Sequence, residues 1–201
     1  MIAVVDYNTG NLRSVANALQ RVGAEFTLTA DPALLLQAER VILPGVGEAA
    51  SAMARLRERG LDTVIPRLKA PVLGICIGMQ LLCSWSEEGD TPCLGVFSAR
   101  VRRLAATTEE GARLKVPHVG WDTIERLRSP LFNGIDEGAY LYYVHSFAAG
   151  IDPQQTVATT EYGSAFSAAL ARDNFFGVQF HPEKSGRTGA RILENFLNGN
   201  L

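Results

Sequence analysis

Apolar and polar residues alternate in blocks along the first half of the chain. Four short runs rich in β-branched and other apolar residues are separated by longer segments in which apolar residues recur every three or four positions. The runs are IAVVD (2–6), EFTLTA (25–30), RVILP (40–44) and APVLGIC (70–76). Runs of this kind predict buried strands, and the periodic segments predict helices. The rhythm therefore predicts a mostly parallel central sheet flanked by helices.

Two segments carry the clearest helical pattern. Residues 11–23 (NLRSVANALQRVG) place apolar side chains on one face and end in Gly23, a common helix stop. Residues 188–200 (TGARILENFLNGN) repeat the pattern at the end of the sequence. The side chains expected to face inward are Leu12, Val15, Leu19 and Val22 in the first segment, and Ile192, Leu193, Phe196 and Leu197 in the second.

After about residue 90 the pattern changes to strand-like pieces. They include WDTIE (121–125), LYYVHSF (141–147), TVATTEY (156–162) and the pair SAFSAALAR (164–172) and FFGVQFH (175–181), which the dipeptide DN joins. Two such runs with a two-residue polar connection predict a hairpin, so the second half is expected to add antiparallel strands. No linker, repeat or low-complexity tract interrupts the sequence. We therefore expect residues 1–201 to form one α/β domain.

The composition is typical of a globular protein. Hydrophobic residues make up 47% and charged residues 20% of the 201 residues, and 19 Lys and Arg against 21 Asp and Glu give a net charge of −2. This balance argues against a nucleic-acid partner, since phosphates attract clustered positive charge. The densest basic cluster, RVRRL (100–104), is expected to be an edge strand with solvated charges.

The sequence offers no sign of export or of membrane insertion. Its first residues, MIAVVDYNTG, lack the basic region and cleavage pattern of a secretory signal, and no apolar run has the length of a membrane span. The three cysteines have no framework spacing, which fits a compartment that keeps thiols reduced. We expect a cytoplasmic protein without a membrane association.

One cysteine lies in a context that favours catalysis. In GICIG (74–78) an apolar run leads into Cys76, and a helix-like segment follows directly, as in a nucleophile elbow. Gly74 and Gly78 would remove side chains that collide in so tight a turn, and the N–H of Ile77 would point at an oxyanion beside the sulfur. The pattern alone leaves a second interpretation open, a buried structural cysteine at the end of a core strand.

A candidate base lies near the end of the sequence. His181 follows a strand-like run in GVQFHPEKS (177–185), Pro182 stops the strand, and Glu183 is close enough to fix the imidazole tautomer. Alone, HPE could equally be a strand end with a surface ion pair. Together with GICIG, it predicts a Cys-His-Glu triad.

Three motifs in this order carry a resemblance that covers essentially the whole chain. PGVG (44–47), GICIGMQLL (74–82) and VQFHPEKS (178–185) resemble the triad-type, class I glutamine amidotransferases. The segments DYNTGNLRSV (6–15), KVPHVGWD (115–122) and YYVHSF (142–147) are similar to those of the glutaminase subunits of imidazole glycerol phosphate synthases. In the first segment, Asn8 and Thr9 depart from the usual family pattern. The resemblance implies a flavodoxin-like central sheet.

The resemblance also implies a reaction and a set of site residues. Glutamine would be hydrolysed to glutamate and ammonia through a γ-glutamyl thioester. The implied residues are Cys76, His181 and Glu183 for catalysis; Gly45, Val46, Gly47 and Ile77 for the oxyanion hole; Gln80, Glu88, Ser146 and Phe147 for glutamine; and Asn11, His118, Trp121, Tyr142 and Lys184 for the face toward a synthase subunit. Packing roles for Trp121 and Tyr142 remain an alternative.

The implied partner is a (β/α)8-barrel cyclase in a heterodimer. It would receive the ammonia directly and make imidazole glycerol phosphate and aminoimidazole carboxamide ribotide in histidine biosynthesis, and its bound nucleotide would activate the glutaminase allosterically. We expect no cofactor, and no metal site at His118 and His145, which lie 27 residues apart. The rival functions are another triad-type amidotransferase, a γ-glutamyl hydrolase or a non-catalytic regulatory subunit.

Overall fold

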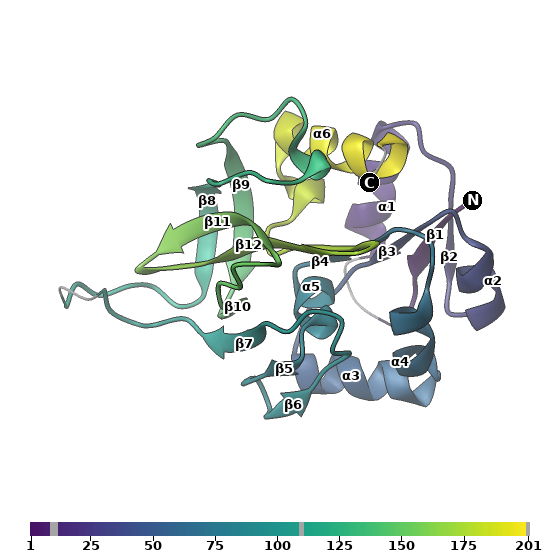
Figure 1. Ribbon diagram of the computed structural model, residues 1–201, viewed down its shortest axis with the longest axis horizontal. Helices are drawn as coiled ribbons and strands as arrows, with labels where there is room; N and C mark the ends of the chain where they lie inside the picture. The colour runs from purple at the N-terminus through teal and green to yellow at the C-terminus, as the bar shows by residue number, and fades with distance from the viewer. Residues whose placement is uncertain (9–11, 109–110, 200–201) are drawn as a thin grey trace.

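A seven-stranded sheet forms the centre of the computed structural model, which describes residues 1–8, 12–108 and 111–199 (Figure 1). Its order is β11-β12-β13-β4-β3-β1-β2. The strands are β1 (Ile2–Val5), β2 (Phe26–Thr29), β3 (Arg40–Leu43), β4 (Val72–Ile75), β11 (Thr156–Tyr162), β12 (Ser164–Arg172) and β13 (Phe175–Val178). Neighbours from β13 to β2 pair in parallel, whereas β11 and β12 are antiparallel. The order β2-β1-β3-β4-β13 is flavodoxin-like, which confirms the predicted mixed sheet.

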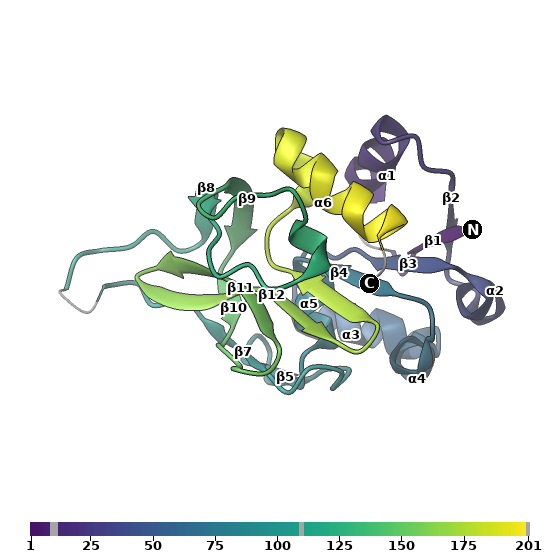
Figure 2. The same ribbon diagram turned by 45° about the horizontal axis from the view of Figure 1, so that its top comes forward.

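Helices cover both faces of this sheet (Figures 1 and 2). One face carries α1 (Leu12–Arg21) and α6 (Gly186–Asn198), and the other carries α3 (Ala49–Glu58), α4 (Leu61–Val64) and α5 (Ile77–Leu82). The shorter elements are α2 (Pro32–Gln37) and the 3-10 turns η1 (Ile65–Arg67), η2 (Pro130–Phe132) and η3 (Pro182–Lys184). Both predicted helices are confirmed. Of their eight expected inward positions, Leu12, Val22 and Leu197 are only partly buried.

The predicted hairpin at DN is present. Strands β12 and β13 pair antiparallel up to Arg172 and Phe175, and Asp173 between them adopts a left-handed φ of 52°. Aspartate tolerates this conformation better than most residues, which is why the two-residue turn forms here.

Two smaller sheets come from residues 85–149. One has the order β10-β7-β5-β6, formed by β5 (Trp85–Ser86), β6 (Thr91–Pro92), β7 (Arg100–Arg103) and β10 (Phe147–Ala149). The expectation that RVRRL forms an edge strand is wrong, because β7 lies between β10 and β5, although its three arginines are exposed as expected. The flanking strands come from distant segments, so local charge did not reveal them.

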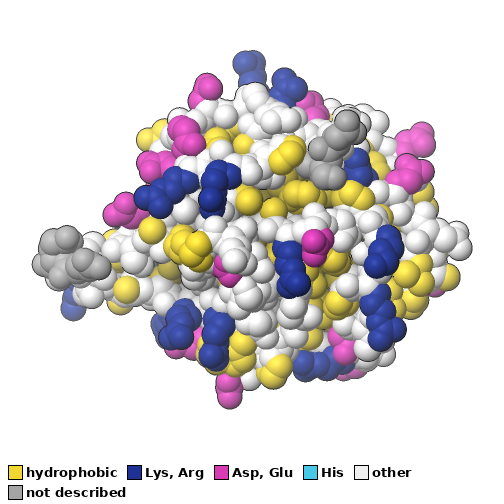
Figure 3. All heavy atoms as spheres, viewed as in Figure 1, with side chains coloured by type: hydrophobic (Ala, Val, Ile, Leu, Met, Phe, Trp, Pro, Cys, Tyr) yellow, Lys and Arg dark blue, Asp and Glu magenta, His cyan; other side chains and the backbone are white. Residues whose placement is uncertain are grey.

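The third sheet is a ribbon of β8 (His118–Thr123) and β9 (Tyr140–His145). One of its faces packs inward, and the other exposes Val119, Trp121 and Tyr140 at 56%, 54% and 61% of their surfaces. On the molecular face in Figure 3, basic and acidic side chains are interspersed, as the near-neutral composition leads one to expect. Among the residues described, no helix combines the length and apolar character that crossing a membrane requires.

Candidate active site

Cys76 lies between a buried strand and a short helix, as the sequence predicts. Strand β4 ends at Ile75, α5 begins at Ile77, and the backbone of Cys76 has φ 54° and ψ −109°. A non-glycine residue in this region is strained and persists only where its surroundings fix it. The Cys76 N–H donates to the Val178 carbonyl at 2.8 Å, which ties the turn to β13.

The two flanking glycines permit this turn by close packing. A Cβ on Gly78 would lie 1.9 Å from the Leu43 carbonyl oxygen, and one on Gly74 would lie 2.8 Å from the backbone of Gly78. No side chain fits at either position without displacing backbone. The predicted mechanical reason for both glycines is therefore confirmed.

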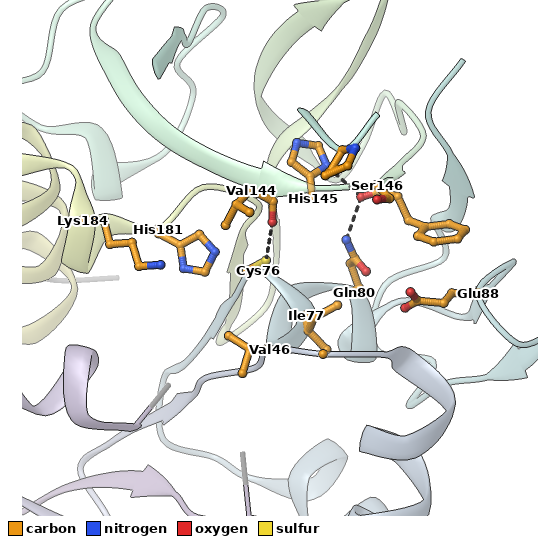
Figure 4. Close-up of a pocket in the computed structure, with 13 residues that line it drawn as sticks. Val46, Cys76, Ile77, Gln80, Glu88, Val144, His145, Ser146, His181 and Lys184 are labelled. Carbon is orange, nitrogen blue, oxygen red and sulfur yellow. Dashed lines mark hydrogen bonds between the residues drawn. The ribbon is translucent and has the colours of Figure 1, made fainter. Parts of the chain in front are cut away.

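His181 and Glu183 meet Cys76 at the same edge of the sheet. Because β13 and β4 pair in parallel with Val178 opposite Ile75, the residues that follow both strands emerge side by side. His181 Nδ1 lies 2.7 Å from Glu183 Oε1, and the two residues are only 1% and 7% exposed. His181 and Cys76 line one cavity (Figure 4).

The surroundings of His181 favour its charged form. Burial by itself lowers the pKa of this imidazole, but hydrogen bonding to Cys76 and Glu183, together with the negative charges of both, raises it to about 10. The ring can therefore hold a proton at neutral pH and deliver it to a departing group.

The cavity has a volume of about 300 Å³, at the small end of the range for ligand sites. Most of the residues predicted for the site line it: Cys76, His181, Val46, Gly47, Ile77, Gln80, Glu88, Ser146, Phe147 and Lys184. Gln80 is almost fully buried and donates from Nε2 to the Phe147 carbonyl at 2.8 Å. Among the described residues, its Oε1 has no hydrogen-bond partner.

The loop 44–47 borders the cavity, and its two glycines are required for different physical reasons. Gly47 has a φ of +97°, whereas Gly45 is required for close approach, because its Cβ would lie 2.6 Å from the Gly78 nitrogen. Gly45, although implied for the oxyanion hole, does not line the cavity, whereas Val46 and Gly47 do. Tyr7 Oη donates to the Pro44 carbonyl at 2.8 Å and anchors the start of the loop.

Glu88 is half-buried at the rim of the cavity and is held there by a helix. Its Oε2 accepts a hydrogen bond from the Ala49 N–H, at the start of α3, at 2.8 Å. Burial raises the pKa of Glu88 and the adjacent charge of Glu48 adds to this, whereas the Ala49 hydrogen bond opposes it. The carboxylate is thus fixed in place with one edge toward the cavity.

The residues predicted for a partner face separate into three groups. Trp121 is exposed and its ring lies 5.9 Å from that of Tyr142, over which Lys184 Nζ lies at 5.8 Å. His118 is only 4% exposed, stacked against Tyr162, so its side chain offers no surface to a partner. The prediction for Asn11 falls outside the described residues.

Some contributors to the site were not predicted. Pro117, Val144 and His145 also line the cavity, and the Val144 carbonyl accepts from Cys76 Sγ at 3.9 Å. Gln179, fully buried, donates to the same sulfur at 3.6 Å, and its signal in the sequence is a polar residue inside the apolar run GVQF.

His118 and His145 lie together despite their separation in sequence. They are cross-strand partners in β8 and β9, with His118 Nδ1 at 3.2 Å from His145 Nε2. Burial lowers the pKa of His145 to about 4, an effect that the His118 and His181 charges reinforce and the hydrogen bond to Phe147 opposes. Over the described part of the chain, no group of three or more potential metal ligands occurs.

Comparison with known proteins places these features in a family. Residues 3–199 match the family model described as glutamine amidotransferase class-I. The chain is 50% identical over 196 residues to the imidazole glycerol phosphate synthase subunit HisH of Bacteroides fragilis, covering 98% of both chains, and 51% identical over 197 residues to that of Bacteroides thetaiotaomicron, again covering 98% of both. A solved glutamine amidotransferase, 20% identical, superimposes with a TM-score of 0.75 over 98% of this chain and 97% of that one, which shows the shared fold.

Proposed function

This chain belongs to the class-I glutamine amidotransferase family, and from that premise we propose that it is the glutaminase subunit of an imidazole glycerol phosphate synthase. It is an enzyme that hydrolyses glutamine. One arrangement supports the proposed active site. Cys76 and His181 line a cavity of about 300 Å³, and Glu183 Oε1 lies 2.7 Å from His181 Nδ1.

In the proposed mechanism, His181 Nε2 holds the proton of Cys76, and Cys76 Sγ attacks the side-chain carbonyl carbon of glutamine as a thiolate. The imidazolium then gives that proton to the leaving amide nitrogen, which departs as ammonia and leaves a γ-glutamyl thioester. His181 next takes a proton from water, which attacks the thioester and releases glutamate. Glu183 holds the tautomer and supports the charge of the ring.

The remaining cavity residues supply binding and charge stabilisation in this proposal. The N–H of Ile77 and one N–H of the 45–47 loop would receive the oxyanion. Glu88 is suited to the substrate ammonium group, and Gln80, which lines the same cavity, would also contact the bound glutamine. Ser146 and Phe147 form the opposite wall.

The partner is proposed to be a (β/α)8-barrel cyclase in a heterodimer. Ammonia released into neutral water is largely protonated and loses its nucleophilicity, so direct transfer to a second site is required. The exposed face of the β8–β9 ribbon, with Val119, Trp121 and Tyr140, lies next to Tyr142 and the cavity residue Lys184. Large exposed aromatic side chains of this kind are typical of interface anchors. We place the cyclase on this face and the complex in the cytoplasm.

The test is glutamate release from glutamine by the chain alone, with cyclase, and with cyclase plus its nucleotide ligand. We expect strong stimulation in the full mixture, its loss in Cys76→Ser, and its retention in the matched control Cys93→Ser, which removes a thiol that does not line the cavity. Brisk turnover that ignores the cyclase would indicate an independent hydrolase. No turnover in any mixture would indicate a regulatory subunit.

A further inference from the structure

Gln179 is a buried polar residue beside the nucleophile that the proposed mechanism does not use. Its side chain has no exposed surface and does not line the cavity, yet its Nε2 group donates to Cys76 Sγ at 3.6 Å. Burial of an amide costs free energy unless the amide is hydrogen-bonded. An apolar side chain would be the usual choice at such a position. The amide of Gln179, directly after β13 and against the sulfur, therefore needs a physical reason.

The neighbours of Gln179 determine which end of its amide faces the sulfur. The Phe147 carbonyl can only accept, so Gln80 presents Nε2 to it, at 2.8 Å. The second hydrogen of the same group goes to Gln179 Oε1 at 2.9 Å. Gln179 then has only Nε2 to direct at Cys76. His145 Nδ1 donates to the same Phe147 carbonyl at 2.8 Å, which fixes the far end of the chain of hydrogen bonds.

The sulfur thus contacts one acceptor and one donor. The thiol of Cys76 donates to the Val144 carbonyl at 3.9 Å, a contact that becomes unfavourable once the thiol loses its hydrogen. The hydrogen bond from Gln179 strengthens in that event, because its acceptor then carries a charge. The donor therefore favours the form of the sulfur that attacks a carbonyl carbon.

We propose that Gln179 orients the Cys76 sulfur and stabilises its thiolate, and that Gln80 and the Phe147 carbonyl hold Gln179 in the donating orientation. This inference rests on the proposed function in that it takes Cys76 as the nucleophile. The competing explanation is that Gln179 only fills space and supports Gln80. The two differ in one observable, because only a thiolate donor changes how the reactivity of Cys76 depends on pH.

The experiment measures alkylation of Cys76 by iodoacetamide as a function of pH, without glutamine or cyclase. Gln179→Met keeps the side-chain length and removes the donor. We expect it to slow alkylation at pH 7 by about tenfold and leave the limiting rate at high pH unchanged, since a hydrogen bond to a charged group has roughly this effect. Gln20→Met, at an exposed position on α1, is the matched control and should follow the wild type.

Fragment-level mass spectrometry assigns the label to each cysteine, so Cys83 reports on the fold. Its side chain is fully buried and stays unlabelled as long as the chain is folded. An alkylation profile of Gln179→Met that superimposes on the wild type, with Cys83 protected, would overturn the proposal. Labelling of Cys83 would show that the variant unfolds. In that case a measurement on the wild-type chain tests the proposed role of Gln179.

That measurement uses protein labelled with ¹⁵N at the glutamine side chains. The Gln179 side-chain amide resonance should shift over the pH range in which Cys76 becomes reactive, and should not shift in Cys76→Ala. An amide that ignores this range in the wild type would overturn the proposal by itself. Both readouts are independent of glutamine turnover. A chain that releases no glutamate but shows the shifted profile would refute the proposed function and leave the role of Gln179 intact.

Discussion

Substituting Gly78 by alanine should separate two backbone segments on which the site depends. The added Cβ would lie 1.9 Å from the Leu43 carbonyl oxygen, whereas real Cβ contacts essentially never fall below 3.0 Å. Helix α5 and the end of β3 must therefore move apart by more than 1 Å. The nearest atoms are backbone, so no side-chain rotation relieves the contact.

This movement reaches the proposed oxyanion hole directly, because the 44–47 loop begins at the next residue. A donor displaced by about 1 Å leaves hydrogen-bond distance of a developing oxyanion, and loss of one such donor costs about 10²–10³ in rate. Overpacking of this kind costs about 1–3 kcal/mol of stability. We expect Gly78→Ala to lower kcat by that factor, and to lower Tm by about 2–4 °C for each kcal/mol lost.

The assay is glutamate release at saturating glutamine with nucleotide-bound cyclase, together with calorimetric unfolding of the subunit. Gly150→Ala is the matched control, since its nearest neighbour, the Arg100 carbonyl, is 3.8 Å from the added Cβ. It should keep wild-type turnover and Tm. If Gly78→Ala turned over within twofold of the wild type, the loop would not depend on the packing of α5 against β3, and the reasoning would be refuted.

Three further predictions concern the base and the loop anchor. Because the His181 pKa is raised to about 10, its proton is held at neutral pH and lost as the pH rises through that value, so kcat in a pH series should fall on that alkaline side; a constant kcat there would contradict this. Glu183→Gln removes one of the groups that raise this pKa, so the alkaline decline should move to lower pH and kcat should drop by about 10²–10⁴. A retained cooperative unfolding transition checks that the variant is folded, and an unmoved alkaline decline would contradict the prediction. Tyr7→Phe leaves the buried Pro44 carbonyl without its donor and should lower the free energy of unfolding in urea by about 1–3 kcal/mol. Tyr140→Phe, at a side chain that is 61% exposed, is the control and should not lower it. Equal urea midpoints for the two variants would argue against Tyr7 as an anchor of the loop.

Local patterns sufficed for the parts of the fold that local patterns determine. The strand runs, the two long helices and the hairpin at Asp173 depend on periodicity and turn chemistry within a few residues. The position of β7 does not, because its neighbours β10 and β5 are brought in by long connections. That the whole chain forms one domain stays a prediction.

The site likewise contains residues that local motifs indicate and contacts that only the folded chain brings together. GICIG and HPE are local motifs whose turn residues determine where their side chains lie, so the sequence indicated Cys76, His181 and Glu183. The His118–His145 pair could not be deduced from a separation of 27 residues, because its contact arises from the register of β8 and β9. Gln179 reaches the sulfur only through the turn after β13, a path no spacing rule describes.

The backbone of Tyr142 connects the outer ribbon to the base. Its N–H donates to Ser185 Oγ at 2.9 Å, and its carbonyl accepts from the His181 N–H at 2.9 Å. Its side chain meanwhile lies against Trp121 on the outward face. A displacement of β9 imposed from outside must therefore either break these two bonds or carry the imidazole with it. The backbone of β9 thus connects the outer face of the ribbon mechanically to His181. A partner that binds this face and shifts β9 would change the orientation of the His181 imidazole.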